Sequence, residues 1–480
     1  MKKISFTLLI VFAVFSTTKA QNSDFKPSGN LWGYTFGDYY YVAHSDSLGR
    51  GAGNVQYKPY STTSTLNAIT GVTPTPTVNA AGDITKLTIA TTKSNLFGSG
   101  TNNYTSANAF QLRRFYLGYD YNFAPKFTAY AVLADEQDLD ESGYNTVYLK
   151  YAYVKWSDFY MHQNLLIGQQ TTPSFATTPF GTEPLWGYRS VERTIMDMHN
   201  NDASSDLGIS LEGLVWKGFS GDSLKPNILG YMVQIGNNNS AKPANNGYKK
   251  VRYTLYTSLL QQKLTFGVYG DFWTINAPGL SAGAPGQMGS TYKFYANYKT
   301  KRFKIGTEVY DQVWGQCAQL STSTPASPQY RDVEIFGWSI FASGKILENL
   351  NAFARLDIYN PDLRYHSSDT YTAITGAPIV PSYVQNQTLT TSLSTYSLGA
   401  TPVSQATVFS TQTFYTVGLD YTPVKRFHIM PNIWVDQFKS LANVPSGATH
   451  ANKDYDFVPR VTFYYLFNAS KSVNNNGMDN

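Results

Sequence analysis

Segments of about ten residues in which apolar and polar side chains alternate recur along this 480-residue chain. Alternation with a period of two places one set of side chains on each face of a β-strand. In the segment 263–273, for example, Phe266 and Val268 fall on one face, whereas Tyr269 and Asp271 fall on the other. Beyond residue 20 we find no apolar stretch of helical length. The chain is therefore expected to consist of strands with one face for lipid and one for water.

These segments number about sixteen, an even number that is typical of bacterial outer-membrane barrels. An open sheet edge leaves backbone amides without partners in hydrocarbon, so such strands must close on themselves. The fold class that we predict is all-β, a transmembrane antiparallel β-barrel of about 16 strands with long extracellular loops. The expected strands lie near residues 29–42, 109–122, 127–134, 146–156, 164–171, 206–216, 227–236, 248–260, 263–274, 290–299, 303–314, 332–343, 350–358, 413–422, 426–437 and 456–467.

The connections between the expected strands alternate in length. Short links such as NFAPK and LLQQKL follow the even-numbered strands, whereas the long connections 43–108, 172–205 and 359–412 follow odd-numbered strands. Outer-membrane barrels have short periplasmic turns and long external loops. The observed order of connections is therefore expected if both termini lie on the periplasmic side. The alternative class is a soluble secreted β-protein, in which structureless loops of this length are uncommon.

The ends of the chain differ from the segments between them. The first residues carry two lysines, then an apolar run, and end on the small residue Ala20, which predicts a secretory signal peptide over residues 1–20. We expect residues 21–467 to form one outer-membrane β-barrel. Residues 468–480 are polar and are expected to form a C-terminal tail.

Charge and cysteine content exclude several classes of protein. The chain has 37 basic and 32 acidic residues without a concentrated basic run, which argues against nucleic-acid binding. Cys317 is the only cysteine, so no internal disulfide can form. The motifs GxSxG and HExxH are missing and the six histidines are scattered. We therefore predict that the protein is not an enzyme and uses no cofactor or metal.

The long connection 172–205 differs from the other loops because it combines Phe and Trp with a cluster of charges. Glu183, Arg189, Glu192 and Arg193 lie in it, and Asp197 and His199 follow. Such a loop is suited to folding against the barrel wall, where its charges would set the width and field of a pore. The alternative is an ordinary surface loop with local ion pairs.

Projecting the strands assigns a set of charged side chains to the lumen, because a charge at the lipid midplane costs about 2 to 4 kcal/mol for Arg or Lys. Basic and acidic members nearly balance, which argues against a strong ion preference. The basic members are Arg114, Lys150, Lys250, Arg252, Lys293, Lys304, Arg355 and Arg460, and the acidic ones are Asp120, Glu212, Asp271, Glu308, Asp357, Asp420 and Asp436.

Aromatic residues also fall on the predicted inner face, where they could form a stacking track for sugar rings. The alternative is that they belong to the girdles at the two membrane interfaces. The residues concerned are Tyr269, Trp273, Tyr295, Tyr310 and Trp434.

The order of motifs over 109–216 resembles the phosphate-selective porin family, the OprO/OprP-like porins, in a Bacteroidetes-type member. The motifs are QLRRFYLGYDYNFAPKFTAYAVL, TVYLKYAYVKW, NLLIGQQTTPSF and SVERTIMDMHNNDASSDLGISLEG. The resemblance implies a sixteen-stranded, usually trimeric porin whose long third loop narrows the channel. It would place Arg113 or Arg114, together with Arg189 and Arg193, near the pore. Phosphate selectivity in that family depends on a ladder of basic residues, and here the basic lumen residues alternate with acidic ones.

From these observations we predict an outer-membrane porin through which small hydrophilic solutes diffuse passively and with weak selectivity. One alternative is a specific channel for phosphate or another anion, or for oligosaccharides. Another is a plugged structural or adhesive barrel. The expected partners are outer-membrane lipid and lipopolysaccharide, small hydrophilic solutes including phosphate, and two further copies of the chain in a homotrimer.

Overall fold

The computed structural model describes residues 25–44, 75–78, 84–88, 106, 108–136, 145–175, 182–199, 201–218, 225–242, 248–275, 287–319, 330–365, 397–398, 401–402, 410–440 and 453–467. The predicted signal peptide and the polar tail at 468–480 lie outside these residues. No helix in the described part of the chain is long and apolar enough to cross a membrane.

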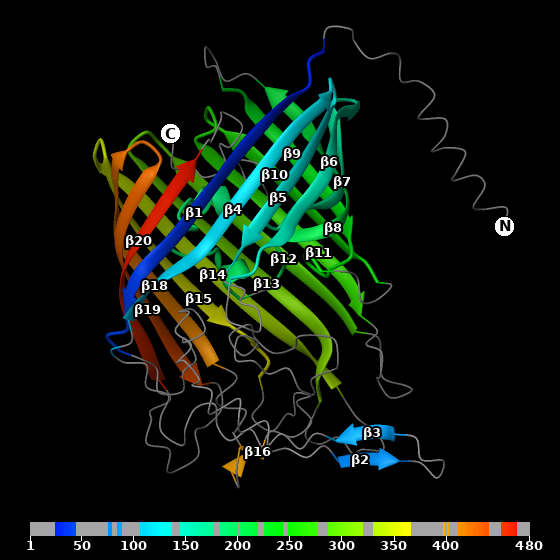
Figure 1. Cartoon of the computed structure of the whole chain (residues 1–480), viewed down its shortest axis with the longest axis vertical. Coiled ribbons are helices and arrows are strands. Elements are labelled where there is room, and N and C mark those ends of the chain that lie inside the picture. Colours follow the sequence, from blue (N-terminus) through cyan, green and yellow to red (C-terminus); the bar gives the residue numbers. More distant parts are fainter. Residues whose placement is uncertain are drawn as a thin grey trace, which may run out of the picture.

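Sixteen of the described strands form one closed antiparallel barrel (Figure 1), which confirms the predicted fold class. Each strand pairs with its neighbours in sequence, and β1 closes the barrel by pairing with β20 as well as β4. The strands are β1 (Ser28–Tyr41), β4 (Asn108–Ala124), β5 (Phe127–Asp135), β6 (Tyr148–Tyr160), β7 (Gln163–Thr171), β8 (Ser205–Gly218), β9 (Asn227–Gly236), β10 (Lys250–Leu259), β11 (Leu264–Ile275), β12 (Gln287–Lys299), β13 (Phe303–Gln319), β14 (Tyr330–Leu347), β15 (Leu350–Asn360), β18 (Ser410–Val424), β19 (Phe427–Ser440) and β20 (Lys453–Phe467).

The two faces of the strands follow the predicted alternation. On β11 the side chains of Val268 and Phe272 are exposed on the outside, whereas Tyr269 and Asp271 between them are buried inside. Exposed apolar side chains recur on the outer face of the other barrel strands. This outer face is suited to hydrocarbon, and the polar groups are directed to the lumen.

Two bulges break this alternation on the inner face. Where β4 pairs with β1, the register shifts so that Arg113 is an extra residue, and both Arg113 and Arg114 are buried inside. Where β6 pairs with β5, the register skips Lys150, and Lys150 and Tyr151 both lie on the inner side. A bulge re-aims a side chain in this way because one strand has an extra residue against its partner.

Short turns join the strands at the end of the barrel where β1 begins and β20 ends, at the top of Figure 1. The connections β4–β5, β6–β7 and β18–β19 are of this kind. This agrees with the predicted order of short and long connections. Two short strand pairs lie within the long connections. They are the hairpin β2 (Thr75–Val78) with β3 (Ile84–Thr88) and the pair β16 (Ser397–Leu398) with β17 (Thr401–Pro402).

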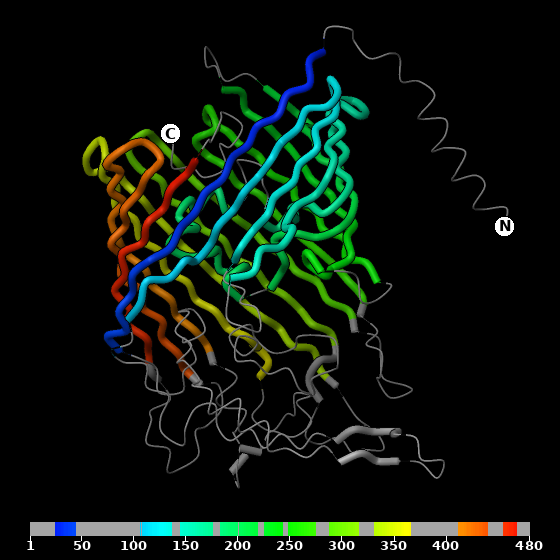
Figure 2. Tube along the Cα trace, in the orientation of Figure 1, coloured from blue at the N-terminus to red at the C-terminus, as the bar shows by residue number. Residues whose placement is uncertain are grey.

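The connection between β7 and β8 is not a surface loop. It contains two short helices, α3 (Thr182–Trp186) and α4 (Ile195–Met198), and its described residues lie within the outline of the barrel in Figure 2. Its side chains make contacts with strands from several sides of the barrel, as described below. We call the described residues 172–175, 182–199 and 201–204 of this connection the lumen loop.

Candidate functional site in the barrel lumen

The backbone of the lumen loop is held by cations of the barrel wall. Within the described residues, side chains from β4, β12, β13, β15 and β20 donate hydrogen bonds to its carbonyl oxygens. The pairs are Arg113 and Arg460 with Val191 (2.7 and 3.1 Å), Lys304 with Trp186 (2.9 Å), Lys293 with Ser174 (2.5 Å) and Arg355 with Arg193. Buried carbonyls need partners, and these donors supply them from widely separated strands. The loop therefore crosses the lumen.

Aromatic packing holds the same loop. The Trp186 ring lies 5.5 Å from the Phe341 ring of β14, and the Tyr188 ring stacks on Phe353 of β15 at 4.4 Å. His199 stacks on Tyr359 with ring centroids 3.5 Å apart. Full burial of one large apolar side chain is worth about 1.5 to 3 kcal/mol. The loop is thus part of the packed interior rather than a segment surrounded by solvent.

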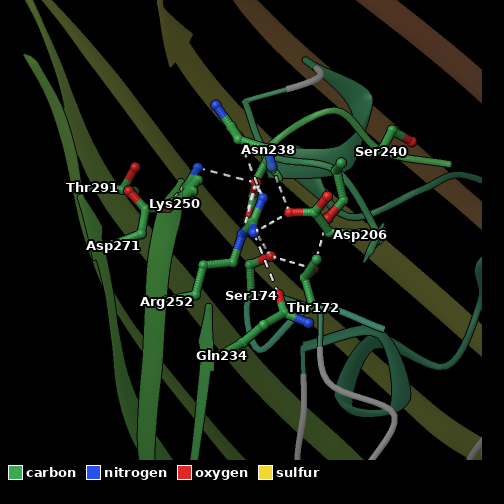
Figure 3. A network of polar contacts seen from close by, with 12 residues as sticks. Thr172, Ser174, Asp206, Gln234, Asn238, Ser240, Lys250, Arg252, Asp271 and Thr291 are labelled. Carbon is green, nitrogen blue, oxygen red and sulfur yellow. Dashed lines mark hydrogen bonds and ion pairs between the residues drawn. The ribbon is translucent and has the colours of Figure 1, made fainter. Parts of the chain in front are cut away.

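The end of the loop nearest β8 is fixed by a buried network of charges around Asp202. The Arg252 guanidinium donates to both carboxylate oxygens of Asp202, at 2.9 and 3.0 Å, and the Lys250 ammonium lies 3.1 Å from one of them. Arg252 also contacts Asp206 at 2.7 Å, and Asp206 accepts the backbone N–H of Asn238 at 2.8 Å (Figure 3). Burial alone would raise the pKa of Asp202, but Arg252 and Lys250 outweigh it and hold the pKa well below its ordinary value.

A second charged group lies at the other side of the loop, beside β4, β5 and β6. Glu136 accepts from Arg114, from Lys150, and from the Tyr148 hydroxyl at 2.6 Å. Arg189 of the loop lies 3.4 Å from Glu136. Arg189 also contacts two carboxylates of its own loop, Glu183 at 2.7 Å and Asp197 at 3.4 Å. We call the cluster of Arg114, Glu136, Lys150, Glu183, Arg189 and Asp197 the open edge of the loop.

The open edge is more exposed than the network around Asp202. The side chains of Glu183 and Arg189 are 22% and 14% exposed, whereas those of Arg252 and Asp202 are 0% and 1% exposed. Glu183 and Arg189 therefore keep some contact with solvent, whereas Arg252 and Asp202 keep almost none. Burial raises the pKa of Glu183, with Arg189 opposing this effect and Asp197 adding to it.

Glu192, which lies between Arg189 and Asp202 in the sequence, is tied to the wall. Its carboxylate is 3.5 Å from the Arg113 guanidinium and 3.8 Å from that of Arg193. Burial opposes ionisation, but the positive charges of Arg113, Arg193 and Arg460 lower the pKa of Glu192 to about 2. Glu192 is thus an anion that pins the middle of the loop.

The structure places the predicted lumen cations on the inner face, but it surrounds most of them with protein. Lys250, Arg252, Lys293, Arg355 and Arg460 are all buried and contact carboxylates or loop carbonyls. The predicted aromatic set is also buried, including Tyr269 and Trp434. Their role as pore-lining residues stays a prediction, as does that of Arg114, Glu183, Arg189, Glu192 and Arg193.

Sequence reasoning missed the partners that hold these cations. Asp38 of β1 lies between Arg113 and Arg460, at 3.8 and 3.7 Å. Asp202 follows α4, and Glu136 follows the last residue of β5. Asp202 and Glu136 lie in a loop and at a strand end, where no periodic pattern separates them from solvated residues, whereas Asp38 lies within β1 on the same inner face as Phe36 and Tyr40, where alternation is a signal. Among the described residues, no group of His, Cys, Asp and Glu side chains could hold a metal ion.

Comparisons with known proteins support the fold and leave the family open. No family model and no curated protein matches the chain. Among solved structures, the chain is similar to the outer membrane channel DcaP of Acinetobacter baumannii, with 12% identity, a TM-score of 0.51, and coverage of 94% of this chain and 100% of that chain. It is also similar to OmpT of Vibrio cholerae, with 8% identity, a TM-score of 0.46, and coverage of 94% and 100%.

The likeness to DcaP agrees with the closed sixteen-stranded barrel described above. At 12% identity it shows the fold alone. None of the comparisons points to the phosphate-selective porins in particular, so that resemblance stays a prediction.

Proposed function

We propose that the chain is an exported outer-membrane porin that lets small hydrophilic solutes diffuse through its lumen with weak selectivity. The observation that carries this proposal is a closed barrel whose lumen is crossed by one loop tied to opposite parts of the wall. A barrel of this width holds water unless a segment narrows it. A fixed loop limits the size of solutes without any covalent chemistry.

The charges of the open edge support weak selectivity. The cations Arg114, Lys150 and Arg189 lie against the carboxylates Glu136, Glu183 and Asp197. The fields of paired opposite charges nearly cancel for a solute that passes beside them. A phosphate-selective channel would need donors that are open to the solute, whereas Arg252, Arg355 and Arg460 donate to carboxylates or carbonyls of the protein.

The outer face supports the proposed location. Its exposed apolar side chains would contact outer-membrane lipid and lipopolysaccharide. We also propose the homotrimer that the sequence resemblance implies. Cross-linking of the protein in intact membranes tests this assembly, because a monomer would yield no trimer band.

A plugged structural barrel is the second candidate, and the burial of the lumen loop favours it. Trp186 and Asp202 are almost completely covered, so the loop fills much of the lumen around them. In that case the open edge would not continue through the barrel.

Single-channel recording in a planar bilayer separates these functions. A weakly selective porin gives stable current steps in symmetrical potassium chloride, a small reversal potential in a salt gradient, and no block by phosphate. Anion-selective steps that phosphate blocks would instead support an anion channel. The absence of steps from folded protein would contradict the porin and leave the plugged barrel.

A further inference from the structure

Aromatic side chains of the inner wall fall into two groups. The group on β11, β13 and β19, which includes Tyr269, Tyr310 and Trp434, is buried and cannot be reached by a solute. A second group consists of Trp32 and Tyr34 of β1 with Tyr148 and Tyr151 of β6. These four side chains are only partly buried and pack against the same core cluster as Trp186 of the lumen loop. They lie beside the open edge of the loop.

The β1 side chains form a continuous row. Trp32, Tyr34 and Phe36 occupy alternate positions and face the lumen, with 6.4 Å between the centroids of successive rings. The rings are nearly parallel, at 15° and 4°. Gly118 lies opposite Trp32 in the register with β4, and a Cβ atom at this position would collide with the indole ring. The backbone of β4 therefore leaves the space in which the Trp32 ring lies.

Hydrogen-bonding groups lie beside the first two rings of the row. The Trp32 indole N–H donates to Asp120 at 3.0 Å, so a carboxylate lies at the edge of the first ring. Tyr34 is 4.5 Å from Tyr116, whose hydroxyl donates to Glu136 of the open edge. A solute lying against Trp32 and Tyr34, the two partly exposed rings of the row, would meet aromatic carbon and the Asp120 carboxylate at its rim.

We propose that the Trp32–Tyr34 row is a binding track for the rings of neutral oligosaccharides, and this deepens the proposed porin function and rests on it. A sugar ring has an apolar face of C–H groups and a rim of hydroxyls. Aromatic rings pack against the C–H face, and carboxylates accept hydrogen bonds from the hydroxyls. The Trp32 indole that donates to Asp120 is neutral, so the negative charge of Asp120 remains and disfavours anions along the same path.

The test measures block of the ion current by linear glucose oligomers of increasing length. We expect concentration-dependent block that strengthens with length, whereas poly(ethylene glycol) of the same hydrodynamic size gives none at the same concentrations. Trp32→Leu and Tyr34→Leu, which keep apolar bulk but remove the flat rings, should each weaken the apparent affinity at least about tenfold. Tyr119→Leu is the matched control, because Tyr119 of β4 is exposed on the outer face.

A second measurement separates failure of the track from failure of the porin. Isothermal titration calorimetry of the detergent-solubilised barrel with the longest oligomer detects binding without any current. Current without sugar block or binding overturns the track and leaves the porin intact. Binding that is lost in Trp32→Leu, in a barrel that passes no current, supports the track and contradicts the porin. Block or binding that is unchanged in both lumen variants overturns the track.

Discussion

The network around Asp202 and the open edge around Arg189 use the same kinds of side chain for different purposes. Around Asp202 the charges are fully covered, and both oxygens of Asp202 accept from a cation or a hydroxyl. At the open edge the pairs of Arg189 remain partly exposed. Removing the partner of a buried charge costs much free energy, whereas an exposed charge is able to act on a solute that passes it. Burial thus separates the charges around Asp202, which hold the loop, from the charges at the open edge, which keep some contact with solvent.

The largest effect is expected when the buried network loses its central charge. Asp202→Asn keeps the shape of the side chain but leaves Arg252 and Lys250 with less negative charge around them. Breaking such a buried pair costs about 3 to 5 kcal/mol. We expect a lower denaturation midpoint and larger, noisier current steps, because the lumen loop loses its hold at this end. Unchanged stability and conductance would show that the network does not hold the loop.

A smaller effect, on selectivity rather than stability, is expected at the open edge. Arg189→Gln removes one cation and leaves Glu136, Glu183 and Asp197 beside Arg114 and Lys150. The excess negative charge should shift the reversal potential towards cation selectivity by several-fold in permeability ratio. Recording in a salt gradient measures this shift. A shift towards anions, or none, would contradict the placement of Arg189 on the solute path.

Acid should loosen the loop modestly through His199. Burial first, and then Arg193 and Arg355, lower the pKa of His199 well below its ordinary value, with Glu192 opposing them. A released loop would restore the ordinary pKa of about 6.5. The loop bound to the wall therefore keeps its full stability relative to the released loop above that pH. Below that pH it loses up to about 1.4 kcal/mol per pH unit.

This pH effect can be separated from that of Glu192, whose lowered pKa of about 2 costs stability only below its ordinary pKa of about 4.3 in a released loop. His199→Phe retains a ring against Tyr359 and removes the titration. We expect gating noise to rise between pH 7 and 5 in the unsubstituted protein and to stay constant in the variant. Equal pH profiles would rule out His199 as the sensor.

The smallest effect is expected for an ion pair on a turn. Lys126 and Asp158 are 2.6 Å apart, but their side chains are 53% and 47% exposed. Water screens such a pair, so its contribution to stability is small. Asp158→Asn makes the same chemical change as Asp202→Asn and should leave the denaturation midpoint and conductance unchanged. A loss comparable to that of Asp202→Asn would remove the distinction between covered and exposed charges.

The strands and their faces could be predicted because the pleat repeats every two residues, as on β10, where Lys250 and Arg252 face inwards as expected. Alternation failed where a bulge adds a residue. It assigned only one of Arg113 and Arg114 to the lumen, and the structure buries both there. The partners Asp38, Glu136 and Asp202 meet the cations only after the barrel closes and the loop folds in. Such long-range contacts leave no local pattern.

Several anchors of the lumen loop are main-chain oxygens, and this bears on how its sequence can change. Arg113, Lys304 and Arg460 bind carbonyls of Val191 and Trp186, which any residue at those positions would offer. Substitution at position 193, whose carbonyl accepts from Arg355 and whose side chain is 20% exposed, can therefore alter what the loop presents while its path is kept. Mutation of loop residues or exchange of the loop could thus change which solutes the barrel admits without altering the wall.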